Sequence, residues 1–388
     1  MGGGVANVKP HRETLDQLGF RQQFPALDRW AWLDTPGSPP GARPVLDVMR
    51  ELLSTWERGE FAWREWDAAA ELARTAFASL VGVDDSRVSV LGSVAEGVAT
   101  VAKALPPGSI VVADSEYRSV LFPLIALDQD VHPVIRVAAS GDVVTADDLA
   151  AAIRPDTVLV AVSDTLTSTG DRVDLVALRA ATDTVGARLM VDLTQSLGVL
   201  DHDIAAMNPD FIVVHGYKWL LCPRGAAWLV TRPDRLEELA PLLPSWKSTD
   251  PPYGYFGGDL QLPASGSKLD TSPAWFSWVG AIAALDLISR LDVRQVEAHC
   301  VGLARRWVAG ATELGYRPIA PEQNSHIAVV DVGDVGSDLA IRLAAADVKA
   351  SVMGTRLRIG VHYFVNDDDI DRALAAIIPR SRPKERTQ

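Results

Sequence analysis

Short, uninterrupted apolar runs alternate along most of the chain with segments whose apolar residues recur at helical spacing. A short apolar run is typical of a strand buried on both faces, as in a parallel sheet covered by helices. The pattern predicts strands at 88–91, 110–113, 158–162, 189–192, 211–214 and 226–230, with helices at 45–60, 68–80, 94–104 and 175–185. These elements predict an α/β fold with a mostly parallel sheet flanked by helices.

The last third of the chain changes character. Residues 231–243 are expected to form a helix and a linker, and turn formers from 248 to 258 predict an exposed loop near a domain boundary. Helices are then predicted at 278–291, 293–314 and 338–346, with strands at 326–332 and 357–362, the last as an edge strand. We therefore expect an N-terminal arm and substrate-side loop (1–40), a large domain of mostly parallel sheet and helices (41–262) and a smaller α+β domain (263–388).

Composition excludes several classes of function. The net charge is −13 and no basic cluster is present, which argues against nucleic acid and anionic membrane as partners. No apolar run approaches the roughly 18 residues that a membrane-spanning helix needs. Cys222 and Cys300 are the only cysteines, so we expect no disulfide framework, no metal site and a reducing cytoplasmic location.

Two of the apolar runs are followed by polar residues that suggest chemistry. The run at 189–191 stops at Asp192, and the run at 211–214 leads into His215-Gly-Tyr-Lys218. Ligands bind where the strands of an open parallel sheet end, so Asp192 and Lys218 should lie at one crevice. A lysine there can hold an aldehyde cofactor as a Schiff base, while an acid keeps a pyridine nitrogen protonated. Individually, each residue could also be structural.

The motif Asp192-Leu-Thr-Gln-Ser, followed by His215-Gly-Tyr-Lys-Trp-Leu and Pro223-Arg-Gly, resembles the class V aminotransferase group of pyridoxal phosphate (PLP) enzymes. The resemblance covers roughly residues 33–370 and is nearest the isopenicillin epimerase-like and ergothioneine C–S lyase-like members. It implies the PLP fold type I architecture, with Lys218 and Asp192 as catalytic residues and PLP as cofactor. It also implies further cofactor-binding residues: Ser93 and Val94 at the start of a helix, Tyr117 stacked on the ring, Gln195 at the ring hydroxyl, and His215 and Tyr217 near the phosphate.

The resemblance also implies a substrate site. Arg358 matches the arginine that pairs with a substrate carboxylate, and Arg356, two residues earlier on the same strand face, is the competing candidate. Asp164 stands where the cysteine desulfurases, which are members of the same group, have Asn. A buried aspartate at this position needs a hydrogen-bond donor nearby. The segment 269–273 corresponds to one that reaches the partner subunit's phosphate, but the usual Gly-Thr pair is missing, so the roles of Thr271 and Ser272 stay open.

The resulting hypothesis is a PLP enzyme that removes the Cα proton of an amino-acid-like substrate, with β-elimination of the C–S lyase type favoured. No cysteine lies between 346 and 360, where desulfurases carry their sulfur, which argues against a persulfide-forming desulfurase. Aminotransfer, epimerisation and decarboxylating deamination remain alternatives, and a non-catalytic PLP-binding protein is a distant one. The resemblance and the tryptophan-rich segment around Trp275 and Trp278 predict a homodimer.

Overall fold

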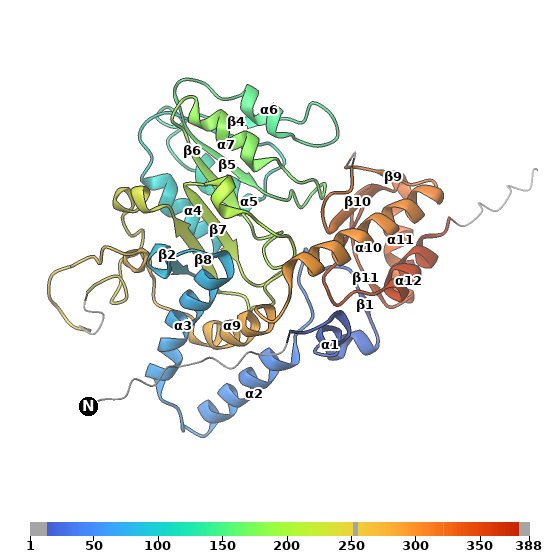
Figure 1. The fold of residues 1–388 in the computed structure, drawn as a ribbon, viewed down its shortest axis with the longest axis horizontal. Coiled ribbons are helices and arrows are strands. Elements are labelled where there is room, and N and C mark those ends of the chain that lie inside the picture. The colour runs from blue at the N-terminus through green and yellow to red at the C-terminus, as the bar shows by residue number, and fades with distance from the viewer. Residues whose placement is uncertain (1–13, 251–254, 321, 380–388) are drawn as a thin grey trace, which may run out of the picture.

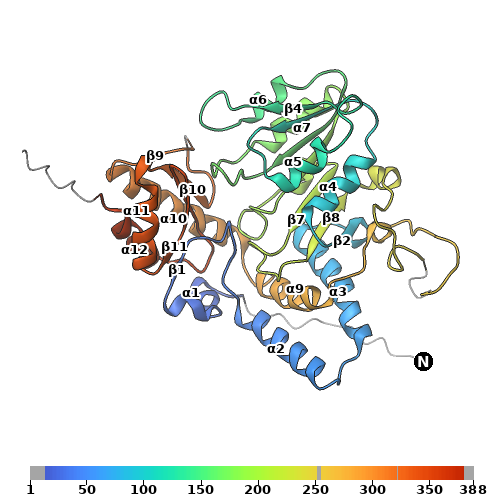
Figure 2. The same cartoon turned by 180° about the vertical axis from the view of Figure 1, so that it is seen from behind.

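The computed structural model describes residues 14–250, 255–320 and 322–379, which form a large part and a small part, each with its own sheet. Figure 1 shows the large sheet surrounded by helices, with the small part beside it and joined to it by α10. The same arrangement viewed from behind is shown in Figure 2. The expected α/β architecture is therefore confirmed, whereas the domain boundaries at 40 and 262 stay a prediction.

The large sheet has seven strands, and all but one of them run in the same direction. Its spatial order is β2 (Val88–Leu91), β8 (Ala227–Thr231), β7 (Phe211–His215), β6 (Arg188–Asp192), β5 (Thr157–Ser163), β3 (Ser109–Ala113) and β4 (Val134–Val137). β8 pairs antiparallel with both β2 and β7, and the other neighbouring pairs are parallel. The carboxyl ends of β3, β5, β6 and β7 consequently meet at one edge, where ligands bind in such sheets.

Both faces of this sheet are covered by helices, which explains why its strands read as uninterrupted apolar runs. On one face, side chains such as Val191 and Val214 pack with α3 (Trp63–Val81), α6 (Ala146–Ala151), α7 (Leu175–Asp183) and α9 (Trp275–Ile288). On the other face, Met190 and Val213 pack with α4 (Val94–Lys103) and α5 (Arg118–Ile125). The alternation of neighbouring residues between two clusters follows from the two-residue period of a strand.

The small part is built on an antiparallel sheet in the order β12 (Ser351–Met353), β13 (Arg356–Gly360), β10 (Ile327–Asp331) and β9 (Arg317–Pro318). Its helices are α10 (Val293–Glu313), α11 (Gly336–Ala345) and α12 (Asp367–Ile377). The expectation of an edge strand at 357–362 is wrong, because β12 turns back through Gly354 and pairs along β13. Arg356 and Arg358 therefore lie on an interior strand, whose backbone groups are paired on both sides.

The N-terminal segment is more ordered than its polar sequence suggests. After residue 13 it forms α1 (Gln17–Arg21), a 3-10 turn (Pro25–Asp28) and β1 (Ala31–Trp32), which pairs with β11 (Val348–Lys349). Phe20 and Phe24 are buried against Phe364 of the small part. Arg21 also donates to Asp369 at 2.6 Å. The described part of the expected arm is therefore a docked segment, and the chain then enters the large part through α2 (Arg43–Glu57).

Two further expectations need correction. Residues 233–238 form only a 3-10 turn, so the helix expected over 231–243 is absent from this described stretch. Trp278 is 2% exposed and packs edge-on against Trp228 at 5.5 Å, so it belongs to the core. Of the expected loop at 248–258, residues 251–254 lie outside the described residues. The remaining short elements are α8 (Ile204–Met207) and 3-10 turns at Asp85–Arg87, Gly266–Leu269 and Gly333–Val335.

No helix in the described ranges is long and apolar enough to cross a bilayer.

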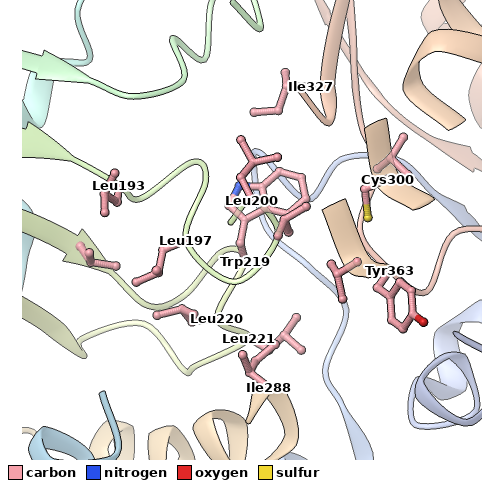
Figure 3. Packing of buried hydrophobic residues seen from close by; sticks show 14 of the residues in the cluster. Leu193, Leu197, Leu200, Trp219, Leu220, Leu221, Ile288, Cys300, Ile327 and Tyr363 are labelled. Atoms are coloured by element: carbon pink, nitrogen blue, oxygen red, sulfur yellow. The ribbon is translucent and has the colours of Figure 1, made fainter. Parts of the chain in front are cut away.

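The two parts meet around one buried side chain, Trp219 (Figure 3). Its ring lies edge-on to His326 at 4.1 Å and is stacked with His362 at 5.6 Å, both from the small part. His362 Nδ1 accepts from the backbone N–H of Tyr363, which leaves Nε2 protonated to donate to the Trp219 carbonyl at 3.1 Å. Since Trp219 follows Lys218 directly, contact between the two parts helps to fix the position of the lysine.

Candidate active site

Asp192 and Lys218 are brought together by two neighbouring parallel strands. β6 ends at Asp192, which pairs with Val213 of β7, and Lys218 follows the end of β7 in the next turn. The Asp192 carboxylate accepts from the backbone N–H of Thr194 at 2.7 Å, and Thr194 Oγ1 accepts from the backbone N–H of His215 at 3.0 Å. This chain of hydrogen bonds ties the end of β6 to the end of β7.

The Asp192 carboxylate is buried. Burial raises its pKa, against the opposing effects of its Thr194 hydrogen bonds and of the Lys218 charge. A buried carboxylate is favourable only when charged or hydrogen-bonding partners compensate for its lost hydration. Asp192 can therefore stabilise a cationic group bound beside it.

Lys218 is distinguished by having no hydrogen-bond or ion-pair partner among the residues that the structure describes. Among the buried lysines of the described residues, Lys247 pairs with Asp67 at 2.9 Å, and Lys268 donates to the Leu236 carbonyl at 2.5 Å. Lys218 Nζ instead lies 5.0 Å from the ring centre of Tyr117 and 5.6 Å from that of Tyr217.

Burial lowers the pKa of Lys218 to about 8, and the charges of Arg358 and Arg224 add to this effect, whereas Asp192 and Asp34 oppose it. A larger share of Lys218 is therefore the neutral, nucleophilic amine near neutral pH.

Tyr117 lies at the start of α5 and is held there by the preceding residue. Glu116 is buried and accepts from the Tyr117 backbone N–H at 2.6 Å, from the Ser163 backbone N–H at 2.8 Å and from Ser163 Oγ at 2.6 Å. Burial raises the pKa of Glu116 to about 7. Glu116 thus links the ends of β3 and β5 and fixes the backbone beneath the Tyr117 ring. Sequence reasoning missed it, although its place between a buried strand and an aromatic residue was a usable signal.

A candidate anion-binding side of the site lies around the beginning of α4. Ser93 is the N-cap of α4, and its Oγ accepts from the Glu96 N–H at 3.3 Å, while Val94 offers only its backbone because its side chain is buried. His215 and Tyr217 stack edge-on at 4.6 Å. His215 Nε2 is buried without a hydrogen-bond partner, and burial together with the charges of Arg224 and Lys218 lowers the pKa of this histidine to about 4.

Gln195 occupies the junction between the site and the small part. Its Oε1 accepts from Trp219 Nε1 at 2.8 Å, and its Nε2 donates to Thr167 Oγ1 at 3.0 Å and to the Pro36 carbonyl at 3.3 Å. In this structure all its polar atoms have protein partners. The predicted contact with a cofactor hydroxyl would therefore have to share the Nε2 group or replace one of its partners.

Arg358 reaches the loop that follows β5. It donates to Thr167 Oγ1 at 2.6 Å and lies 3.5 Å from Asp34, while its Nε is buried without a partner. Arg356 points to the same loop, where it donates to the Ser168 carbonyl at 3.1 Å. Both arginines therefore extend from one face of β13, as their spacing predicts, and Arg358 is the one whose charge affects the pKa of Lys218.

Asp164 has the donors that its burial requires. Its carboxylate accepts from Thr165 Oγ1 at 3.0 Å and pairs with Arg172 at 3.4 Å. The segment 269–273 is anchored by Asp270, which forms a buried ion pair with Arg74 and accepts from the Val90 N–H at 2.9 Å. This contact holds the segment against β2, and the roles of Thr271 and Ser272 stay open.

These groups fit PLP. The unpaired amine of Lys218 suits the cofactor aldehyde, the buried Asp192 suits a protonated pyridine nitrogen, and the exposed ring of Tyr117 offers a stacking surface. The buried Nε2 of His215, which has no hydrogen-bond partner among the described residues, suits the phosphate, as does the start of α4. Gln195 is the exception, because its polar atoms already have protein partners.

Comparisons with known proteins identify the family of the chain. The model of the class-V aminotransferase family matches residues 31–356. The chain is 28% identical to isopenicillin N epimerase of Streptomyces clavuligerus (82% of this chain, 86% of that protein) and 24% identical to an uncharacterized aminotransferase of Bacillus subtilis (93% and 97%). A solved structure of the cystine C–S lyase C-DES, in complex with its reaction product cysteine persulfide, superposes with a TM-score of 0.83 at 21% identity (92% of this chain, 100% of that chain). The chain therefore belongs to the class-V aminotransferase family, a group of PLP-dependent enzymes of fold type I.

Proposed function

We propose that this enzyme uses PLP to remove the Cα proton of an amino-acid-like substrate and then to eliminate a sulfur leaving group from Cβ. The proposal rests on the arrangement of three side chains. Lys218 is buried and has no polar partner among the described residues, Asp192 is buried, and the charge of Arg358 lowers the pKa of Lys218. Bound PLP supplies an aldehyde that captures amines and a protonated ring that withdraws electrons from Cα.

Each residue has a distinct role in this proposal. Lys218 holds the cofactor and then, as a free amine, takes the Cα proton, for which its pKa of about 8 is well matched. Asp192 keeps the ring nitrogen protonated, and Tyr117 covers one ring face. Arg358 binds the substrate carboxylate through its planar guanidinium. Ser93, Val94, His215 and Tyr217 hold the phosphate.

The two cysteines support elimination over desulfuration by a protein persulfide. A sulfur-accepting cysteine must be accessible and readily ionised. Cys222 and Cys300 are both buried, and burial raises the pKa of each thiol well above its usual range. In the proposed reaction the Cβ–S bond breaks and sulfur leaves as the substrate's own thiol, and hydrolysis of the remaining enamine by water gives pyruvate and ammonia. Since both thiols are unpaired, a reducing cytoplasmic setting is part of the proposal.

The alternatives share the first proton removal and are separated by their products. The purified protein should be incubated with cysteine S-conjugates and a panel of amino acids while pyruvate, ammonia, keto acid and optical rotation are followed. Pyruvate and ammonia in equal amounts, without an added keto acid, are expected. Product formed only with an added keto acid would identify an aminotransferase, and inversion at Cα without net cleavage would identify an epimerase.

Arg358→Ala is expected to lose substrate recognition while keeping the cofactor. Removing a charge-assisted bidentate contact should cost about 2–3 kcal/mol in kcat/KM. The cofactor absorbance should stay, because Arg358 donates to Thr167 and Ser351 and is not assigned to the phosphate. Steady-state kinetics with an amino-acid substrate measures the effect.

Arg356→Ala is the matched control, because it removes the neighbouring arginine from the same face of the strand. It should be much milder. A large loss of kcat/KM in Arg356→Ala, with normal kinetics in Arg358→Ala, would show that Arg356 and not Arg358 binds the substrate carboxylate. Normal kinetics in both would mean that the substrate presents no carboxylate here.

A homodimer is also part of the proposal. With Trp278 in the core, the apolar surface is formed by Trp56 on α2, Phe61 in the turn after α2, Trp66 on α3, and Trp275 and Phe276 on α9; Trp56 and Phe61 are half-exposed. We expect light scattering to give close to twice the 41.7 kDa of one chain. Trp56→Glu should shift the protein toward monomer, whereas Ile341→Glu, at a 70% exposed position on α11, should not. A fully active wild-type monomer would contradict this assignment.

A further inference from the structure

Arg224 is a charged residue beside the candidate active site for which the proposed chemistry has so far no use. It lies in the loop between β7 and β8, shortly after Lys218, and is exposed. Its backbone is fixed, because Ser277 Oγ donates to the Arg224 carbonyl at 2.7 Å. The next residue, Gly225, has a φ of +107°, and a Cβ there would lie 2.8 Å from Ser277 Oγ. The loop therefore presents Arg224 from a defined position.

The guanidinium of Arg224 turns back toward the site. Its Cζ lies 4.8 Å from the centre of the Tyr217 ring, the same ring that has Lys218 Nζ at 5.6 Å. Within the described ranges, Arg224 forms no ion pair with an acid. Two cations thus share one aromatic ring without a nearby carboxylate that neutralises Arg224, an arrangement that favours binding of an anion.

His215 lies on the same side of the site. Its ring contacts Tyr217, and its buried Nε2 lacks a hydrogen-bond partner. Burial is the main cause of the lowered pKa of His215, and the charges of Arg224 and then of Lys218 lower this pKa further. Both groups also contact the same ring, since the Tyr217 ring centre lies 4.8 Å from Arg224 Cζ and 4.6 Å from the His215 ring centre. An anion placed between them would satisfy Nε2 and neutralise Arg224 together.

The first turn of α4 packs on the face of β7 that carries His215. A Cβ on Gly97, in that turn, would lie 3.2 Å from Val213, and Val213 and His215 share a face of the strand because they are two residues apart. The helix start already holds one negative group, because the Glu96 carboxylate accepts from the Gly92 N–H at 2.9 Å. Backbone N–H groups of α4 alone are thus poorly suited to a doubly charged ligand, and a nearby cation is needed.

We propose that Arg224 binds the phosphate of PLP, together with His215 and Tyr217, and so sets the affinity of the protein for its phosphorylated cofactor. This inference rests on the proposed function. It predicts that the arginine matters for the phosphate and not for the aldehyde or the ring. Arg224 would then be a cofactor-binding residue with no part in proton transfer.

The test compares two ligands that differ only in the phosphate. Cofactor-free wild-type protein and the Arg224→Ala, Arg224→Lys and Arg29→Ala variants are titrated with PLP and with pyridoxal, and binding is followed by absorbance. Arg29 is a matched control, because it is an exposed arginine 4.5 Å from the ring of Trp30, away from the site. Arg224→Ala should bind PLP about tenfold more weakly and should bind pyridoxal as tightly as wild type. The expected loss of PLP affinity is modest because Arg224 is exposed and solvent screens its charge. Arg224→Lys should keep most of the PLP affinity, and Arg29→Ala should match wild type.

Equal losses for PLP and pyridoxal, or no loss for PLP, would overturn the assignment. The two proposals fail in different ways. If wild-type protein does not capture PLP on Lys218, the proposed function fails, and the role of Arg224 fails with it. If wild-type protein captures PLP there and Arg224→Ala binds it as tightly, only the role of Arg224 is wrong.

Discussion

Lys218→Ala is expected to abolish turnover, with a loss on the order of 10⁴-fold or more, because one side chain supplies both the covalent attachment and the base. Borohydride treatment of the wild-type enzyme should fix the cofactor to the peptide that contains Lys218, and peptide mapping identifies the labelled residue. The variant should show no fixed label. Label on any other of the seven lysines would contradict the assignment.

The pH dependence of cofactor capture provides an independent check on Lys218. Its folded-state pKa of about 8 is below the ordinary lysine value, so the amine is protonated and unreactive below that pH and becomes a nucleophile above it. The rate at which cofactor-free protein captures PLP should therefore rise through about pH 8. Lys268→Ala is a suitable control, since that buried lysine donates to a backbone carbonyl and should be irrelevant to capture.

Asp192→Asn is expected to give the second largest effect, an increase of several kcal/mol in activation free energy and so a roughly thousandfold decrease in kcat. The amide keeps the size of the side chain but cannot stabilise a protonated pyridine nitrogen. Some PLP should still bind, with a shifted absorbance band, because Lys218 and the phosphate contacts are retained. Turnover is measured with the best substrate found for the wild-type enzyme.

Asp164→Asn separates this effect from the loss of any buried acid near the site. Asp164 is also buried, but it pairs with Arg172 and Thr165 and has no role assigned at the cofactor. Its replacement should leave the cofactor spectrum unchanged. Near-normal turnover in Asp192→Asn would mean that Asp192 pairs with another group.

The sequence was most informative where the local pattern and the global fold coincide. The apolar runs before Asp192 and Lys218 are buried strands of the large sheet, and their alignment follows from parallel pairing. Glu116 was missed because a single acid in a loop carries no periodic signal, and its burial depends on Ser163, a residue distant in sequence.

Other differences have the same origin in tertiary contacts. The strand at 357–362 read as an edge strand because its partner β12 has only three residues, too few for a recognisable pattern. The sequence predicted Trp278 to lie at an interface, because α9 is apolar on all sides and its pattern does not indicate which side is buried. Its contact with Trp228 shows that it belongs to the core. The docking of α1 depends on Phe20 and Phe24 meeting Phe364.

Trp219 has a consequence for the order of events during biosynthesis. The ring neighbours that hold it, His326 and His362, are synthesised more than a hundred residues after Lys218. Gly360 closes the same contact late in the chain, because a Cβ there would clash with Pro36 and lie 3.1 Å from the tip of the Trp219 ring. A growing chain that already contains Lys218 but not yet residue 362 therefore lacks the contacts that hold Trp219, and with it Lys218, in place. Acquisition of the cofactor should follow synthesis and docking of the segment that contains His362, so the visible absorbance of bound cofactor would report assembly of the two parts.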